Sequence, residues 1–368
     1  MKVRRAYLKL LYDGYDASKE IQDDLVSFSY TDNAHGVADD VSISLKDETG
    51  IWISDWFPEE GDKIRPIIHT ESWRYDGDSQ SLDCGSFEID EPECSGPPST
   101  MTINGNSMPT NSAFKDEKKT RAWSNKSLQM IASQIAYESG LRPFFDSKTN
   151  PMFKYQLQDK VSDAGFLVEL CNDHGFGVKI SDHQLILFNI DEYKAKESVY
   201  QYIKGQTSIE SYNFKKALVG SKYSGVKIKY RDGDSLKWYK YIPDTSKEEK
   251  IYTIKSIADD YATAERMTMT KFSDLSDKVF HCSMTVTLNL LLIGAVCIDI
   301  SGFGKYDGKY YLDKVTHSFG GGSTSSFEAR KIVSKINEPV ESSGPRIEVT
   351  KPEEVVIYHS SDIIRTAS

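Results

Sequence analysis

Alternation of apolar and polar residues at every second position is the feature that most restricts how this chain can fold. Val41, Ile43 and Leu45 alternate with polar residues, which predicts a strand with one buried face. Shorter runs of the same kind return in the second half of the chain, at residues 226–230, 238–242, 279–286, 295–301 and 310–319. Both ends of the chain are therefore expected to be mainly β.

Turn signals separate these runs. Asp13-Gly14, Asp76-Gly77 and Asn104-Gly105 are pairs of the kind found in hairpin turns. Asp232-Gly233 predicts a further hairpin between two of the later strands. The segment 91–98, rich in proline and glycine, predicts a break in regular structure.

The middle of the chain has helical spacing instead. Leu128, Ile131 and Ile135 recur at intervals of three and four, which predicts a helix that stops at Gly140. Further helices are expected at 162–174 and 258–272, and two short strands at 178–180 and 185–188.

These patterns predict a mainly β protein with an α+β insert. We expect two similar β modules with a small α/β module inserted between them. The predicted divisions are 1–105 for the first β module, 106–205 for the inserted module, 206–337 for the second β module with one inserted helix, and 338–368 for an extended C-terminal tail. No residue-level repeat connects the two β parts.

Charge limits the partners that the chain can have. The formal net charge of −10 argues against a general nucleic-acid binder and against adsorption to an anionic membrane. The longest apolar run, 290–298, is about half the roughly 20 residues that a membrane helix needs. We therefore expect no membrane anchoring and no specific nucleic-acid binding.

Cysteine usage indicates a reducing compartment. The five cysteines are dispersed and form no C-x-x-C pair, so free and mostly buried thiols are expected. The N-terminal segment is interrupted by Lys9 and Asp13, and it is expected to form a strand and not a signal peptide. The two observations predict a chain that is made and kept in a reducing cytoplasm.

A search for catalytic patterns gives weak candidates. Glu88 and Asp90 are two apart on an expected strand, with Glu91 and Glu93 close by, and paired acids can serve a glycosidase. A solvated strand face is the simpler interpretation, because no isolated acid stands out as a partner.

Metal and nucleotide motifs are also incomplete. His281-Cys282 and the pair His174 and His183 lack the common zinc spacings. The turns at 302–304 and 320–323 lack the remaining residues of dinucleotide and phosphate loops. We therefore predict no catalytic, cofactor-binding or metal residues, no cofactor and no enzymatic activity.

Three segments resemble the late control D family of phage tail baseplate hubs, which is related to the hub portion of type VI secretion spike proteins. The first spans 28–47, from Phe28-Ser29-Tyr30 to Leu45-Lys46-Asp47, and continues through Trp52 and 55–62. The second is 156–175, with a Ser-Asp pair, a Phe-Leu pair and a closing glycine. The third is 308–319. Together they extend over residues 3 to 336, and the first is the most specific.

The resemblance implies a late structural protein of the virion tail baseplate, or of a bacteriocin-like tail particle, made in a bacterial host cytoplasm. It implies a ring-forming chain in which 1–105 and 206–337 are two tube-type β-barrel domains. It also implies a homotrimer that initiates tail-tube assembly in a contractile injection system. The partners would be the tail-tube protein, a central spike protein and other baseplate proteins. Because spike-fused members continue further than residue 368, the spike is expected to be a separate polypeptide.

Two other functions stay open at this level. A tail-associated protein that binds peptidoglycan or hydrolyses the cell wall would use the acidic strand. A secreted effector scaffold with no role in a tail is the third alternative.

Overall fold

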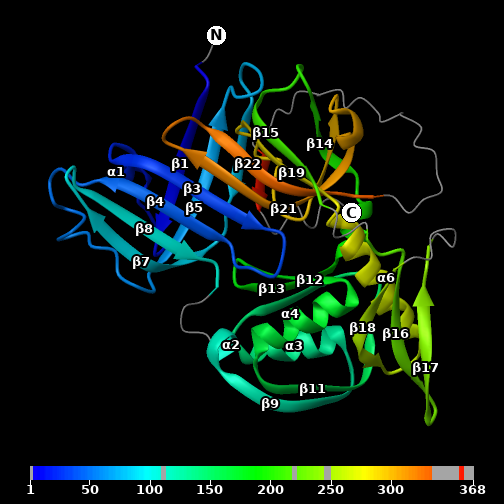
Figure 1. Cartoon of the computed structure of the whole chain (residues 1–368). Coiled ribbons are helices and arrows are strands. Elements are labelled where there is room, and N and C mark those ends of the chain that lie inside the picture. The colour runs from blue at the N-terminus through cyan, green and yellow to red at the C-terminus, as the bar shows by residue number, and fades with distance from the viewer. Residues whose placement is uncertain (1–2, 109–112, 218–221, 244–249, 334–355, 360–368) are drawn as a thin grey trace.

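The computed structural model describes residues 3–108, 113–217, 222–243, 250–333 and 356–359. Figure 1 shows a large β part and, below it, a smaller part that contains most of the helices. Within the described residues, 15 strands join in one sheet and three smaller sheets lie apart from it. The predicted class, mainly β with an α+β insert, is confirmed.

The first part of the chain supplies strands at one end of the large sheet. Its alternating segment forms β4, where Val41, Ile43 and Leu45 point into the core. The elements are β1 Arg5–Tyr12, β2 Tyr15–Asp16, α1 Ser18–Gln22, β3 Leu25–Asn33, β4 Asp40–Lys46, β5 Lys63–Glu71, β6 Ser79–Asp83, β7 Phe87–Ser95 and β8 Thr100–Asn106.

One turn prediction in this part is wrong and another is only partly right. Asn104-Gly105 lies inside β8, because the glycine serves a close approach: a Cβ there would be 3.0 Å from Val41 Cγ1 and 3.2 Å from Phe87 Cβ. Of the break predicted at 91–98, residues 91–95 continue β7, whereas 96–99 form the turn that leads to β8. Pro92 is tolerated because β7 pairs on one side only at this point, so no ladder hydrogen bond from a proline nitrogen is missed.

The inserted segment forms helices over small sheets. Ser127 and Ser162 cap α3 and α4 by accepting hydrogen bonds from the Met130 and Gly165 amides, and Gly175 ends α4 with a φ of 80°. Both helices were predicted and are confirmed. The elements are α2 Ala113–Asp116, β9 Lys118–Ser127, α3 Leu128–Glu138, β10 Arg142–Asp146, β11 Met152–Ser162, α4 Asp163–His174, β12 Phe176–Ser181, β13 Gln184–Asn189 and α5 Ile190–Ala195.

The last third of the chain returns to the large sheet. Its β21 pairs antiparallel with β3, from Lys314 opposite Asn33 to Phe319 opposite Phe28. One apolar core runs under strands from both ends of the chain. The elements are β14 Ser198–Ile203, β15 Ile209–Lys216, β19 Phe280–Thr287, β20 Cys297–Ser301, the short 3-10 turn η3 Gly304–Tyr306, β21 Gly308–Phe319 and β22 Thr324–Lys331.

Between β15 and β19 the chain leaves the large sheet. β16 Gly225–Asp232, β17 Ser235–Tyr241 and β18 Ile251–Ala258 form a separate sheet that packs on α6 Tyr261–Asp277. The hairpin predicted at Asp232-Gly233 is confirmed. The helix expected at 258–272 begins later, because Asp260 caps it through the Thr263 amide, and it continues to Asp277. No helix in the described part of the chain is long and apolar enough to cross a membrane.

One part of the predicted tail 338–368 is described. The strand β23, Val356–His359, is extended and pairs in parallel with β6 of the same chain, with Val356 opposite Gln80. The other residues of the tail lie outside the described ranges. The domain bounds drawn from the sequence stay a prediction.

All five cysteines are free, and four of them are buried, as predicted. Burial raises the pKa of Cys282 to about 12 and of Cys297 to about 11, and it also raises that of Cys171. Because the thiolate is the reactive form, the buried thiols should react slowly.

We expect a thiol reagent at pH 8 to label Cys94 fast in the native protein and the four buried cysteines only slowly. Denaturation without reductant should release all five for labelling. Mass spectrometry of the labelled protein measures both. Fewer than five labels after denaturation would contradict the assignment of free thiols.

Candidate functional site: the polar wall

One face of the large sheet carries small polar side chains across a continuous row of strands. The strands run in the order β15-β19-β22-β21-β3-β4-β8-β7, and each neighbouring pair is antiparallel. We call this face the polar wall. Its residues alternate with buried core residues and stand beside one another in register: Ser211, Asn213, Ser283, Thr285, Thr287, Thr324, Ser326, Glu328, Lys314, Thr316, Ser318, Ser29, Thr31, Asn33, Asp40, Ser42, Ser44, Thr102, Asn104, Asn106, Glu88, Glu91 and Glu93.

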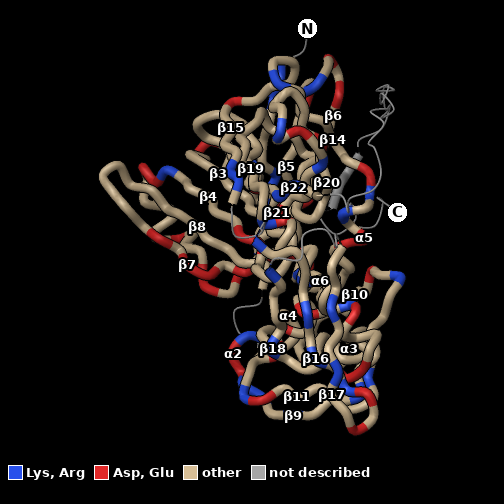
Figure 2. The backbone as a smooth tube through the Cα atoms, turned by 45° about the vertical axis from the view of Figure 1, so that its right-hand side comes forward, with Lys and Arg blue, Asp and Glu red and all other residues tan. Residues whose placement is uncertain are grey.

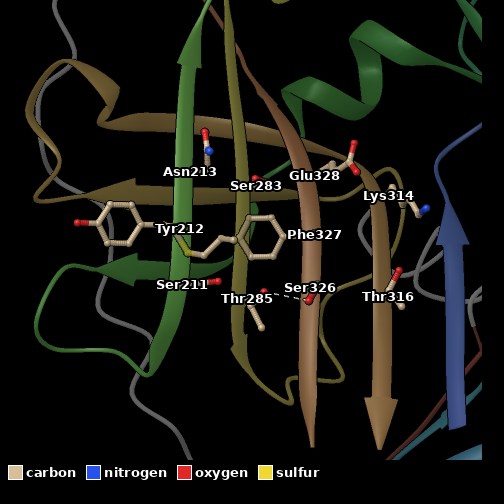
Figure 3. A pocket seen from close by; sticks show the side chains of 11 residues that line it. Ser211, Tyr212, Asn213, Ser283, Thr285, Lys314, Thr316, Ser326, Phe327 and Glu328 are labelled. Atoms are coloured by element: carbon tan, nitrogen blue, oxygen red, sulfur yellow. Dashed lines mark hydrogen bonds between the residues drawn. The ribbon is translucent and has the colours of Figure 1, made fainter. Parts of the chain in front are cut away.

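Hydroxyl groups connect neighbouring strands of the wall. Thr285 Oγ1 and Ser326 Oγ are 3.1 Å apart, and Thr31 Oγ1 and Thr316 Oγ1 are 3.3 Å apart. Figure 3 shows the wall over β15, β19, β22 and β21, where it forms a shallow depression of about 280 Å³. Such a surface offers many weak hydrogen-bonding groups and no deep pocket.

Charged residues are few on the middle of the wall and gather at its ends. Lys314 stands opposite Glu328 in the ladder between β21 and β22. Figure 2 shows acidic residues along β7. Lys215 and Lys216 are exposed and lie at the C-terminal end of β15, which is the outer strand at the opposite edge of the wall. The two ends of the wall therefore have opposite charge.

Both outer strands of the wall have an open edge. In β15, four consecutive residues from Glu210 to Asn213 are exposed, as expected for a strand with a partner on one side only. In β7, the only pairing away from β8 is at Phe87 and Glu88, which face β5. Among the described residues, the stretch 90–95 thus has an unpaired edge.

Aromatic side chains lie beside the edge of β15. The rings of Tyr212 and Phe214 each lie 4.9 Å from that of Phe303, and Tyr212 is 49% exposed. The Lys204 ammonium lies 5.4 Å from the Phe303 ring. The edge thus combines apolar area with positive charge, a combination that is common where proteins bind one another.

A buried ionic cluster holds the β3–β4 connection to the inserted module. Lys179 on β12 reaches Asp32 Oδ1 at 2.5 Å, Asp39 Oδ2 at 2.8 Å and the Asn33 carbonyl oxygen at 2.6 Å. All three charged side chains are 1% exposed. Burial raises the pKa of Asp39 to about 7, although the Lys179 ammonium opposes that rise. The cluster fixes one end of β3, the central strand of the polar wall.

Sequence reasoning did not find this cluster. Its only signal is a lysine between apolar residues of a short strand, and such a lysine can equally mark an exposed position. Asp32 and Asp39 belong to the first family-like segment, but nothing in the sequence links them to residue 179.

The predicted acidic candidates are separated by a β-bulge. Glu88 pairs with Asn106 and Glu91 with Asn104, so Asp90 is the extra residue and has no partner in this ladder. The regular alternation that was expected to place Glu88 and Asp90 on one face is therefore interrupted. Glu88, Glu91 and Glu93 share one face instead.

The histidine candidates do not come together either. His174 is buried and its Nδ1 accepts a hydrogen bond from Arg266, while His183 lies in the β12–β13 turn. Burial lowers the pKa of His174 to about 3. His281 and Cys282 are neighbours on β19 and so point to opposite faces. In the described ranges no three His, Cys, Asp or Glu residues are placed to hold a metal.

The glycine candidates lie in turns. Gly302 and Gly304 have positive φ values of 87° and 67° in the connection after β20. The glycines at 320–322 join β21 to β22, so a strand follows them and not the helix that a phosphate loop requires.

The three family-like segments occupy defined places in this arrangement. The first forms β3 and β4, the third forms β21, and these strands are neighbours at the centre of the polar wall. The second forms the end of β11 and α4.

Comparisons with known proteins agree with the family to which these segments are similar. No protein-family profile matches the chain. A probable baseplate hub protein of Escherichia phage P2 is 27% identical over 179 residues, which cover 48% of this chain and 43% of that protein. The chain thus matches less than half the length of this relative.

Solved structures share the fold over most of the chain. A tail protein from Neisseria meningitidis MC58 superposes with a TM-score of 0.65 at 11% identity, covering 89% of this chain and 96% of that one. A component of the type VI secretion system of Escherichia coli gives a TM-score of 0.53 at 10% identity, covering 85% and 74%. The sequence match and the shared fold together confirm the resemblance to the family of phage tail baseplate hub proteins.

Proposed function

We propose that the chain is the structural baseplate hub of a contractile phage tail or a tail-like particle. It joins a hexameric tail tube to a trimeric central spike and initiates tube assembly. The observation that carries the proposal is the polar wall, which is one continuous antiparallel surface built from two similar halves.

The two halves explain how a trimer meets a hexamer. One half is β15-β19-β22-β21 and the other is β3-β4-β8-β7, and each is a four-stranded antiparallel unit. Three copies of the chain present six such units around an axis. The six units of such a ring can each meet one subunit of a hexameric tube. The three chains of the ring can each meet one subunit of a trimeric spike.

The open edges supply a head-to-tail interface that closes the ring. The β7 edge of one copy pairs with the β15 edge of the next, which brings the acidic strand with Glu91 and Glu93 beside the strand that ends in Lys215 and Lys216. Because the wall has an even number of strands in the described chain, β7 runs opposite to β15, and the new pair is antiparallel like all the others. Closure also removes the two unpaired edges, which otherwise invite aggregation.

The polar wall then faces the channel of the ring. Hydroxyl and amide side chains neither bind polyanions as lysines do nor hold apolar surfaces, so a molecule that passes through is not retained. Lys314 adds a positive charge to this lining, but Glu328 stands opposite it. The role is structural, and we assign no catalytic residue.

The other assignments follow from this position. The inserted module and the β16–β18 sheet lie outside the ring wall and are available to other baseplate proteins. The two halves of the wall correspond to the barrel domains proposed for 1–105 and 206–337. The protein would reside in the tail baseplate.

We expect the purified protein to form a trimer, either alone or once the spike chain is added. Light scattering after size-exclusion chromatography measures the mass, and electron microscopy of the ring locates the polar wall. A strict monomer under both conditions, or a ring that turns the wall away from its axis, would overturn the hub assignment.

A further inference from the structure

The sheet of β16, β17 and β18 has one covered face and one open face. Val226 and Ile228 are fully buried on the covered face, where Ala264 and Met267 of α6 pack against the sheet. Because side chains alternate along a strand, the residues between them point to the other side. In the part of the chain that the structure describes, no element covers that side.

The open face is basic. It carries Lys227, Lys229 and Arg231 from β16 and Lys240 from β17, and none of these four has a carboxylate within salt-bridge distance among the described residues. The one acidic residue of the three strands is Asp232, which pairs with Lys237. Four free cations on one small face contrast with the net charge of −10 of the whole chain.

Apolar side chains are placed between the cations. Trp238 is 49% exposed, and the ammonium groups of Lys227 and Lys229 lie 5.0 and 5.1 Å from its ring. Leu236 and Ile257 are 53% and 45% exposed. A face that serves only to keep a protein in solution does not need a tryptophan and two aliphatic side chains open to water.

The same sheet also has a free edge. Among the described residues the strand order is β17-β16-β18, so β17 pairs with β16 alone. Of the six consecutive residues from Ser235 to Lys240, all except the half-buried Tyr239 are exposed. Its backbone groups on the outer side are therefore open to another strand.

We propose that this surface, the open face together with the β17 edge, binds an extended acidic segment of a neighbouring protein. The segment adds to the sheet as a strand beside β17. Its backbone pairs with β17, and its outward side chains lie next to Leu236, Trp238 and Lys240. Acidic residues at every second position then meet Lys240 directly and Lys229 one strand further away.

The open edge of β17 favours a polypeptide over a nucleic acid, because a polypeptide backbone can continue the hydrogen-bond ladder. Cations two residues apart on β16 repeat at about 7 Å, which is also the repeat of same-face side chains in an added strand. The Trp238 ring is already occupied by two ammonium groups, which leaves less of its face for stacking a base. This inference does not rest on ring formation, because the surface lies on a different sheet from the polar wall.

A peptide of alternating glutamate and threonine is the probe for this surface, with a lysine–threonine peptide and oligothymidylate for comparison. We expect saturable binding of the acidic peptide that weakens as salt rises, with a change in tryptophan fluorescence. Lys229→Glu combined with Lys240→Glu should weaken binding at least about tenfold. Trp238→Phe should remove the fluorescence change, because four other tryptophans report elsewhere.

Lys19→Glu combined with Lys148→Glu is the matched control, since it changes the net charge equally on exposed residues of other elements. It should leave the affinity for the acidic peptide nearly unchanged. Equal losses in both double variants would reduce the effect to net charge and overturn the proposal. Oligothymidylate that binds as tightly as the peptide, or a peptide that does not bind, would overturn it as well.

Discussion

Replacing Lys179 by methionine should lower the free energy of unfolding by about 3–5 kcal/mol. The substitution keeps most of the side-chain volume but leaves Asp32 and Asp39 buried without a cation. An uncompensated buried carboxylate is costly, because its interaction with water is lost and nothing replaces it. Urea titration measures the effect, which is a large share of the stability of a typical domain.

A matched control separates burial from charge. Lys46→Met removes the partner of Asp24 in a far more exposed pair and should change the free energy of unfolding by less than about 1 kcal/mol. Adding Asp39→Asn to Lys179→Met should recover part of the loss, since it removes one unpaired charge. A double variant no more stable than Lys179→Met would show that packing, and not charge, explains the effect.

The same cluster predicts a dependence on pH. The pKa of Asp39 is raised in the folded protein to about 7, so the folded state holds this proton more tightly than the unfolded state. Its contribution to stability is therefore present at low pH and is lost as the pH rises from about 4 to 7. The unfolding free energy of the wild type, relative to that of Asp39→Asn, should therefore fall as the pH rises from about 4 to 7.

The second large effect concerns the ring. Reversing the charge of Lys215 and Lys216 to glutamate should place like charges on the two strand edges that meet, because β7 of the next copy carries Glu91 and Glu93. We expect the protein concentration at half-assembly to rise roughly 10- to 100-fold, because like charges in an interface cost free energy in every one of its copies. Light scattering over a dilution series measures the shift.

The reciprocal change tests which edges meet. Glu91→Lys with Glu93→Lys should weaken assembly similarly, and all four substitutions in one chain should restore it. Lys19→Glu with Lys148→Glu controls for net charge. Failure of the fourfold variant to recover would show that β7 and β15 do not face each other.

Mixing the two reversed chains gives a further distinction. The edges of one reversed chain have the same charge as each other and the opposite charge to the edges of the other chain. A ring without like-charged contacts therefore needs the two kinds of chain in alternation. A ring of three cannot alternate completely, and one mismatched interface remains. The mixture should therefore assemble less well than the fourfold variant, whereas a ring with an even number of subunits would recover fully.

Local signals predicted much of the secondary structure. Apolar residues at helical spacing and closing glycines marked α3 and α4, and alternation marked β4, because these features act over a few residues. The failures have local causes too. Asn104-Gly105 has the composition of a turn, but the glycine is needed for close packing against Val41 and Phe87. The bulge beside Asp90 leaves no mark in the sequence.

The candidate site could not be predicted because it depends on pairs that are far apart in the chain. The ladder between β3 and β21 joins residues 28–33 to 314–319, and no periodicity identifies which strands pair. Period-two patterns show that Thr31 and Thr316 are on polar faces, but not that they share one. The family resemblance included both 28–33 and 314–319, but it did not show that these two segments pair.

The small side chains of the polar wall have a consequence for the width of a channel. In a ring of three copies, strands spaced about 4.8 Å apart would close on a circle roughly 37 Å across before any tilt is considered. Serine and threonine reduce that opening little. Every substitution on the wall occurs three times around the circumference, so a single change such as Thr316→Trp would narrow the passage from three sides at the same height.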